Sequence, residues 1–111
     1  RQSQALWFRN KSNFWYVAVV NNPKHLEDVT VFRKNADGVL ESIEHFPALN
    51  WQNRQWFAES GEKSIFRQAK MYRESMANFY LSDLPLSPGF FKHIEQSPDE
   101  MLVKKNLLNL I

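Results

Sequence analysis

Cysteine is absent from this 111-residue chain, so disulfides, thiolate metal sites and a cysteine nucleophile are excluded. Only three glycines occur, too few for a glycine-rich phosphate-binding loop, and the G-x-S-x-G motif of serine hydrolases is missing. The longest uninterrupted apolar run, residues 14–20, is too short to span a membrane, and no signal-peptide pattern is present. With no catalytic motif in the chain, we expect neither enzyme activity nor a bound cofactor.

Aromatic residues, in contrast, are abundant at 14% of the chain. Hydrophobic residues reach 43% and charged residues 23%, a composition typical of one folded domain rather than a disordered segment. The formal net charge is only +2, which is weak evidence for a polyanionic partner. The aromatic excess indicates either a thick β core or a surface that handles apolar ligands.

Short runs rich in β-branched and aromatic residues, separated by turn residues, predict an all-β fold of sandwich or roll type. Gly38 closes a hairpin signal at 35–38, because it accepts the positive φ of the turn. Pro47 has no N–H for a sheet and is expected to interrupt the strand that contains it. The expected strands are 5–9, 13–20, 29–34, 39–46, 48–51 and 55–58.

Residues 61–82 are consistent with either a helix or strands. Ile65, Ala69, Tyr72, Met76 and Phe79 fall at helical spacing, whereas 64–67 and 77–81 are plausible strands. Among the strands, we expect 6–10 and 77–81 to form the sheet edges.

The C-terminal part predicts a linker followed by helix. Prolines at 85 and 88 favour an extended linker, a short helix is expected at 89–95, and Ser97-Pro98-Asp99-Glu100 is a strong helix start. We therefore divide the chain into a β domain at 1–84 and a linker with helix at 85–111. Because the chain begins without Met and ends on the apolar 107–111, we expect it to be a segment of a longer protein.

The titratable residues show no site pattern. His25, His45 and His93 lie in different segments without metal-ligand spacing, and adjacent strand residues Glu44 and His45 should face opposite ways. Basic and aromatic residues do interleave, with Phe32, Phe66 and Tyr72 beside cations, which offers an alternative function as a small β module for single-stranded nucleic acid. A solvated charged face explains the same pattern more simply.

Several expected strands are apolar on both faces, above all residues 14–20. A strand with one solvent-exposed face should alternate between apolar and polar residues. A roll whose sheets splay apart, leaving an apolar trough for a lipid-like ligand, accounts for this pattern. Which face lines the trough cannot be decided from alternation when both faces are apolar.

The order of these motifs resembles the periplasmic domain of lipopolysaccharide-export ABC transporter permeases of the LptF/LptG type, closest to LptG. The matching segments cover nearly the whole chain: 6–9, 13–17, 26–32, the hairpin at 37–40, a lone Trp56 after a polar turn, 84–88, and 97–102 with 107–111.

The resemblance implies a jellyroll-like open β-sandwich with a C-terminal helical segment, held in the periplasm by a bacterial inner-membrane protein, and implies strands at 61–82. The implied partners are lipopolysaccharide, neighbouring LptC-like and LptF-like jellyroll subunits of an export bridge, and a separate cytoplasmic LptB-like ATPase; no nucleic acid is expected. We expect groove or core residues at Phe14, Tyr16, Val31, Phe32, Phe46, Trp56 and Phe79. Candidates for contacts with lipid phosphates at the rim are Arg9, Lys11, Arg33 and Arg67, with exposed solubility charges as the alternative interpretation.

Overall fold

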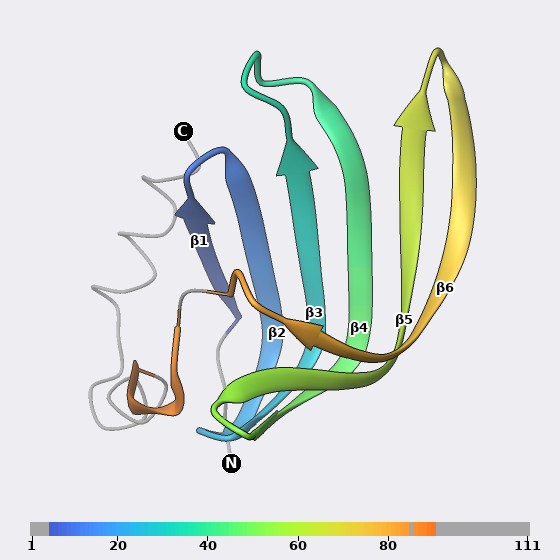
Figure 1. Ribbon diagram of the computed structural model, residues 1–111. Coiled ribbons are helices and arrows are strands. Elements are labelled where there is room, and N and C mark those ends of the chain that lie inside the picture. The colour runs from blue at the N-terminus through green and yellow to red at the C-terminus, as the bar shows by residue number, and fades with distance from the viewer. Residues whose placement is uncertain (1–4, 85, 91–111) are drawn as a thin grey trace.

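Six antiparallel strands form one open sheet in a computed structural model that describes residues 5–84 and 86–90. The strands pair in chain order, so the sheet is a series of hairpins (Figure 1). The all-β prediction is confirmed, and residues 61–82 are strands. The strands are β1 (Leu6–Asn10), β2 (Asn13–Asn22), β3 (His25–Lys34), β4 (Leu40–Gln52), β5 (Gln55–Arg67) and β6 (Lys70–Leu81).

Tight turns join the strands where the backbone adopts positive φ. The predicted hairpin at 35–38 is confirmed: Gly38 has φ +83°, and the Asn35 side chain accepts hydrogen bonds from the backbone N–H groups of Asp37 and Val39. Gln68 and Ala69, between β5 and β6, both have positive φ, which is the pattern of a two-residue type I′ turn.

A crease crosses the sheet from β2 to β6. In a regular strand every second residue faces inward, but at the crease consecutive inward positions of each strand are three residues apart, so two residues instead of one lie between them. Because all five strands carry the extra residue at matching positions, the pairing register is the same on the two sides of the crease. The apolar face therefore stays inward on both sides of the bend. The paired inward positions are Val17 and Val20, Leu26 and Val29, Phe46 and Leu49, Ala58 and Gly61, and Met76 and Phe79.

Pro47 lies on this crease, and the prediction that it ends a strand is wrong. β4 continues through it to Gln52, so the separately expected strands at 39–46 and 48–51 are one. Pro47 is exposed and has no register partner on β3 or β5. Its missing N–H therefore costs no ladder hydrogen bond.

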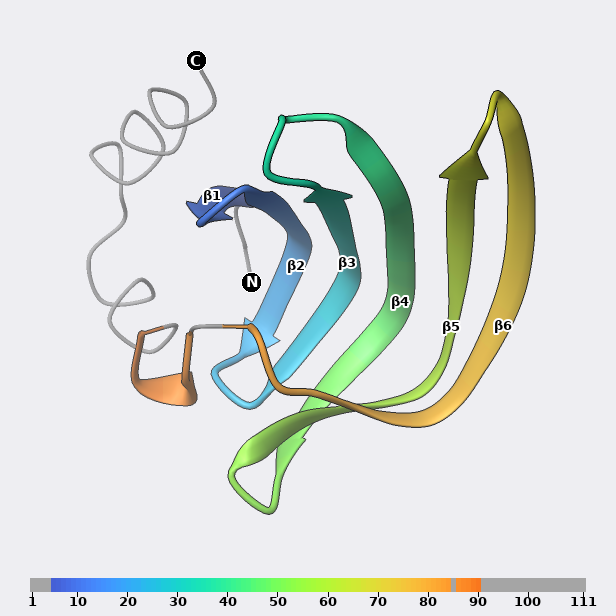
Figure 2. The same cartoon turned by 45° about the horizontal axis from the view of Figure 1, so that its top comes forward.

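The sheet curls around a single apolar core. Leu6 of β1 and Leu81 of β6, at opposite edges of the sheet, belong to the same buried cluster. Figure 2 shows the C-terminal half of β6 crossing beneath the sheet toward β1, while the β5–β6 hairpin stands apart at the other end. The curl is thus closed at one end and open at the other. Residues 88–90 are helical, and the rest of the predicted helices at 89–95 and 97–111 lies outside the described residues.

Candidate functional site: the inner face of the curled sheet

The inner face is apolar at the core and carries charged side chains, among them Arg33, Glu44 and Lys63, toward the open end. Trp15, Phe46 and Trp56 are its largest buried members, each exposed by 1% or less. Phe46 stacks on Phe79 with their ring centroids 6.0 Å apart, and Trp56 meets Trp51 edge-on at 5.1 Å. These rings form much of the buried core.

The segment after β6 lies against this core, and we call residues 82–84 and 86–90 the strap. Leu84 is buried, and Leu86 and Phe90 pack against the core. The indole Nε1 of Trp56 donates a 2.8 Å hydrogen bond to the Leu86 carbonyl, and the Asn10 side chain contacts the Asp83 carbonyl at 3.4 Å. The strap thereby joins the two edges of the sheet across the closed end.

The open end is formed by the hairpin of β5 and β6. Residues 70–75 of β6 are exposed on both faces, and Tyr72 lies opposite Ile65 on the inner face. Met76, further along the same face, is half-buried against the core. Lys63 and Glu74 therefore separate the packed core from Ile65 and Tyr72, which lie on a hairpin that is accessible to solvent.

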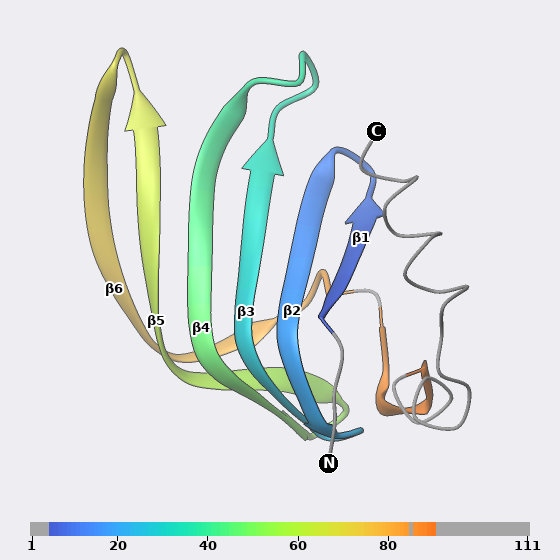
Figure 3. The ribbon, with the colours of Figure 1, turned by 180° about the vertical axis from the view of Figure 1, so that it is seen from behind.

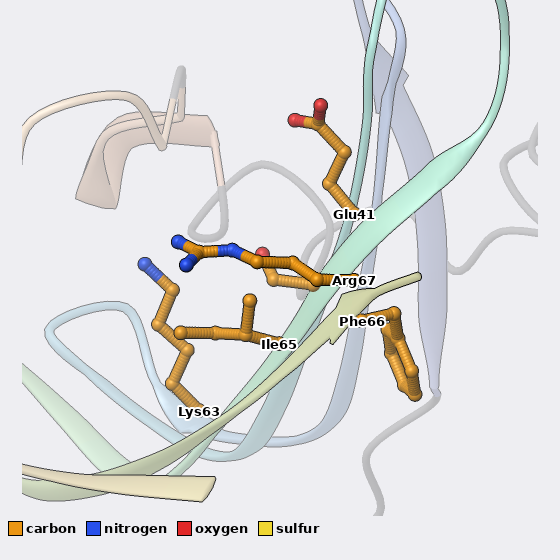
Figure 4. Close-up of a pocket in the computed structure, with 6 residues that line it drawn as sticks. Glu41, Lys63, Ile65, Phe66 and Arg67 are labelled. Carbon is orange, nitrogen blue, oxygen red and sulfur yellow. The ribbon is translucent and has the colours of Figure 1, made fainter. Parts of the chain in front are cut away.

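A depression of about 250 Å³ lies at this open end (Figure 4). Lys63, Ile65 and Arg67 project to one side of β5, with both cationic groups above Ile65, whereas Phe66 projects to the other side. Glu41 lies opposite them. The open end thus places one apolar side chain, Ile65, beside two cations in a largely polar depression.

Four charged side chains form a network beside the core. Arg33 binds Glu44 through two hydrogen bonds of 2.9 and 3.1 Å and also binds Asp83. Lys63 Nζ lies 3.8 Å from Glu44. Burial acts to lower the pKa of Arg33, but hydrogen bonds to Asp83 and Glu44 outweigh it and raise this pKa, so the guanidinium stays charged.

Four of the seven predicted groove or core residues share the inner face. Val31, Phe46 and Trp56 are buried there, and Phe79 is partly buried against them. Because the first three are fully enclosed, they form the core rather than the wall of an open groove.

The other three, Phe14, Tyr16 and Phe32, lie on the outer face. The register pairs Phe14 with Phe32, and their neighbours Trp15 and Val31 take the inward positions. Trp7 joins this outer set, at 4.5 Å from Tyr16 and 6.2 Å from Phe32 between ring centroids. Residues 14–20 are therefore apolar on both sides because one side enters the core and the other carries an aromatic cluster.

The four predicted rim cations are not brought together. Arg9 is exposed and pairs with Phe14 on the outer face, and Lys11 lies in the β1–β2 turn. Arg67 lines the open-end depression, and Arg33 lies in the charged network. Only Arg33 and Arg67 are on the inner face.

The aromatics considered for nucleic-acid stacking are also divided between faces. Phe66 lies on the outer face with Phe32, whereas Tyr72 faces inward. A stacking platform needs its rings on one surface, so these three do not form one.

Two residues of the network, Glu44 and Asp83, were not expected from the sequence to take part in a site. An acidic residue at an inward strand position, three residues before a proline, carries no recognisable signal. Among the described residues, no three His, Cys, Asp or Glu side chains are grouped to hold a metal ion. As expected, Glu44 and His45 face opposite ways: Glu44 is buried, and His45 lies 3.4 Å from Asp28.

Comparison with protein-family models and with curated proteins finds no match for the chain. Within residues 5–84 and 86–90, no helix has the length and apolar character needed to cross a bilayer.

Proposed function

We propose that this chain is the soluble periplasmic domain of a lipopolysaccharide-export permease, and that its inner face carries the lipid's acyl chains. The domain performs no chemistry in this proposal; it offers an apolar path, while a separate cytoplasmic ATPase drives movement. The observation that carries the proposal is the apolar pair Ile65 and Tyr72 on the inner face at the solvent-accessible open end, beyond the charged row of Glu44, Lys63 and Glu74.

The energetics favour such a path. Each CH₂ group taken from water into an apolar contact contributes about 0.8 kcal/mol. An acyl chain lying on Ile65 and Tyr72 removes its own surface and theirs from water, and it leaves the core intact because these side chains are not fully enclosed.

Docking to neighbouring jellyrolls of the export bridge is assigned to the two sheet edges. β1 and β6 each have a strand on one side only, as predicted for 6–10 and 77–81 (Figure 3). The free N–H and C=O groups of an edge strand can pair with a strand of another domain. Two edges allow one neighbour at each side.

The test uses two substitutions in one hairpin. Tyr72 and Met71 are adjacent and equally exposed, at 49% and 51%, but face opposite sides. With a dansyl-labelled undecanoic acid as probe and the full chain, Tyr72→Asp should raise the Kd about tenfold, the loss of roughly two CH₂ contacts. Met71→Asp is the matched control and should leave the Kd within about twofold, since an outer-face residue does not touch the chain.

Equal effects of the two substitutions, or no binding of the probe to the unmodified chain, would end the proposal. In cells, a photo-crosslinker at Tyr72 should capture lipopolysaccharide and one at Met71 should not. The dependence of affinity on salt concentration distinguishes this function from the alternative of nucleic-acid binding. Affinity for nucleic acid falls steeply with ionic strength, whereas affinity for an acyl chain does not.

A further inference from the structure

The charged network contains one fixed carboxylate and one replaceable carboxylate. Glu44 lies in the middle of β4, paired to β3 and β5, with a side chain only 5% exposed. Asp83 follows the last strand, with a side chain 38% exposed. Glu44 is held beside Arg33 by burial in a central strand, whereas Asp83 can leave by movement of the strap alone.

Removal of Asp83 would leave an anion site. With Asp83 in place, two carboxylates hold Arg33; without it, the guanidinium keeps only Glu44, while Lys63 lies between Glu44 and Glu74 in the strand register. The guanidinium edge that Asp83 now occupies presents N–H groups in the forked geometry that suits phosphate and carboxylate. The charge is only partly solvated, because the Arg33 side chain is 23% exposed, so an anion there is favoured.

Trp15 adds a second observation at the same place. The Arg33 guanidinium lies over its ring, with the Cζ atom 5.7 Å from the ring centroid. The Trp15 Nε1 is buried and has no hydrogen-bond partner among the described residues. An unpaired buried donor is costly, and here it belongs to the ring beneath the guanidinium.

We propose that Arg33 and Lys63 form a phosphate-binding site that Asp83 occupies from within the chain, and that a phosphate group displaces Asp83 and thereby frees the strap. Freeing the strap uncovers the core surface that Leu84, Leu86 and Phe90 now cover. An apolar chain attached to the phosphate then gains contact area at the closed end of the inner face. The claim that this site controls access to the acyl-chain site rests on the proposed function. The phosphate site itself does not depend on that function.

The experiment follows the indole N–H signals of the full chain by ¹H–¹⁵N NMR. The Trp56 indole N–H reports whether the strap is bound, because it donates a hydrogen bond to the Leu86 carbonyl. The Trp15 indole N–H reports anion binding, because the Arg33 guanidinium lies over its ring. Three probes are added separately: dodecyl phosphate, the uncharged dodecyl maltoside, and inorganic phosphate. Dodecyl phosphate should shift the indole N–H resonance of Trp15 and remove the protection of the Trp56 indole N–H from hydrogen exchange. Dodecyl maltoside should cause neither change.

Two substitutions that each remove one negative charge test whether phosphate competes with the Asp83 carboxylate for Arg33. Asp83→Asn removes the competing carboxylate and should lower the Kd for dodecyl phosphate about fivefold to tenfold, within the range of ordinary site-to-site coupling. Asp37→Asn, in the exposed hairpin turn, is the matched control and should leave the Kd unchanged. Asp83→Glu keeps the carboxylate and should restore weak binding.

The outcomes separate the two proposals. Equal Kd values for Asp83→Asn and Asp37→Asn, or release of Trp56 by dodecyl maltoside, overturn the displacement of Asp83 by phosphate. The comparison of probes on the unmodified chain decides the matter even if Asp83→Asn does not fold. Trp15 and Trp56 responses to inorganic phosphate alone support a site for free phosphate, and responses to dodecyl phosphate alone support a lipid headgroup. If neither amphiphile binds but inorganic phosphate still shifts Trp15, the proposed function fails while the phosphate site stands.

Discussion

Substitution of Gly61 by alanine tests the packing at the crease. A Cβ at Gly61 would lie 2.6 and 2.8 Å from two ring carbons of Phe46 and 3.0 Å from the His45 carbonyl oxygen. Favourable carbon–carbon contacts begin at about 3.5 Å, so the overlap is roughly 1 Å. The Phe46 ring is fully buried and stacked on Phe79, so it has no free space into which to withdraw.

Overpacking of this kind costs about 1–3 kcal/mol. Since 1 kcal/mol shifts the Tm of a small domain by roughly 4–8 °C, Gly61→Ala should lower the Tm by about 10 °C. Urea unfolding followed by circular dichroism measures the same loss as a lower midpoint at unchanged slope.

A double-mutant cycle of Gly61→Ala with Phe46→Leu tests whether overlap with the Phe46 ring causes the loss of stability. The smaller side chain makes room for the new Cβ, so the double variant should be more stable than the sum of the single effects predicts, by at least about 0.5 kcal/mol. Gly38→Ala is the control: nothing lies within 4 Å of its Cβ, and its cost of about 1 kcal/mol comes from the positive φ and should not be relieved by Phe46→Leu. Additive effects of Gly61→Ala and Phe46→Leu would refute the steric argument.

Two further predictions concern the β5–β6 turn and the charged network. Ala69→Gly should stabilise the domain by about 0.5–1 kcal/mol, because Ala69 has φ +65° and glycine adopts this conformation without strain; an unchanged urea midpoint would count against a strained turn. Glu44→Ala should destabilise by about 2 kcal/mol, because Arg33 loses two charge-assisted hydrogen bonds in a partly buried site. The double variant Arg33→Met with Glu44→Ala should be at least as stable as Glu44→Ala, because it removes the partly buried guanidinium and leaves Lys63 and Asp83, whose side chains are 32% and 38% exposed and can be solvated. Greater loss in the double variant, measured by urea unfolding, would contradict this account.

The helical spacing of residues 65–79 shows why local pattern was ambiguous. Tyr72 and Met76 are four residues apart because Glu74 takes the inward position between them, and Met76 and Phe79 are three apart because of the crease. A strand with these two features has the apolar spacing of a helix. The resemblance to the permease family, rather than periodicity, indicated strands there.

The sequence by itself determined the β class, most of the turns and the two edge strands, because these depend on neighbouring residues: β-branched runs, the hairpin signal at 35–38, and chain order. It also showed that residues 14–20 are apolar on both faces. Which face enters the core was decided only by the tertiary structure, because alternation cannot choose between two apolar faces and the choice is fixed by what each face packs against. The crease required five strands to carry their extra residue in register, and the Arg33 network required Asp83 to approach β3 from 50 residues away in sequence. Such long-range pairings depend on how the whole sheet curls, and no local pattern specifies that curl.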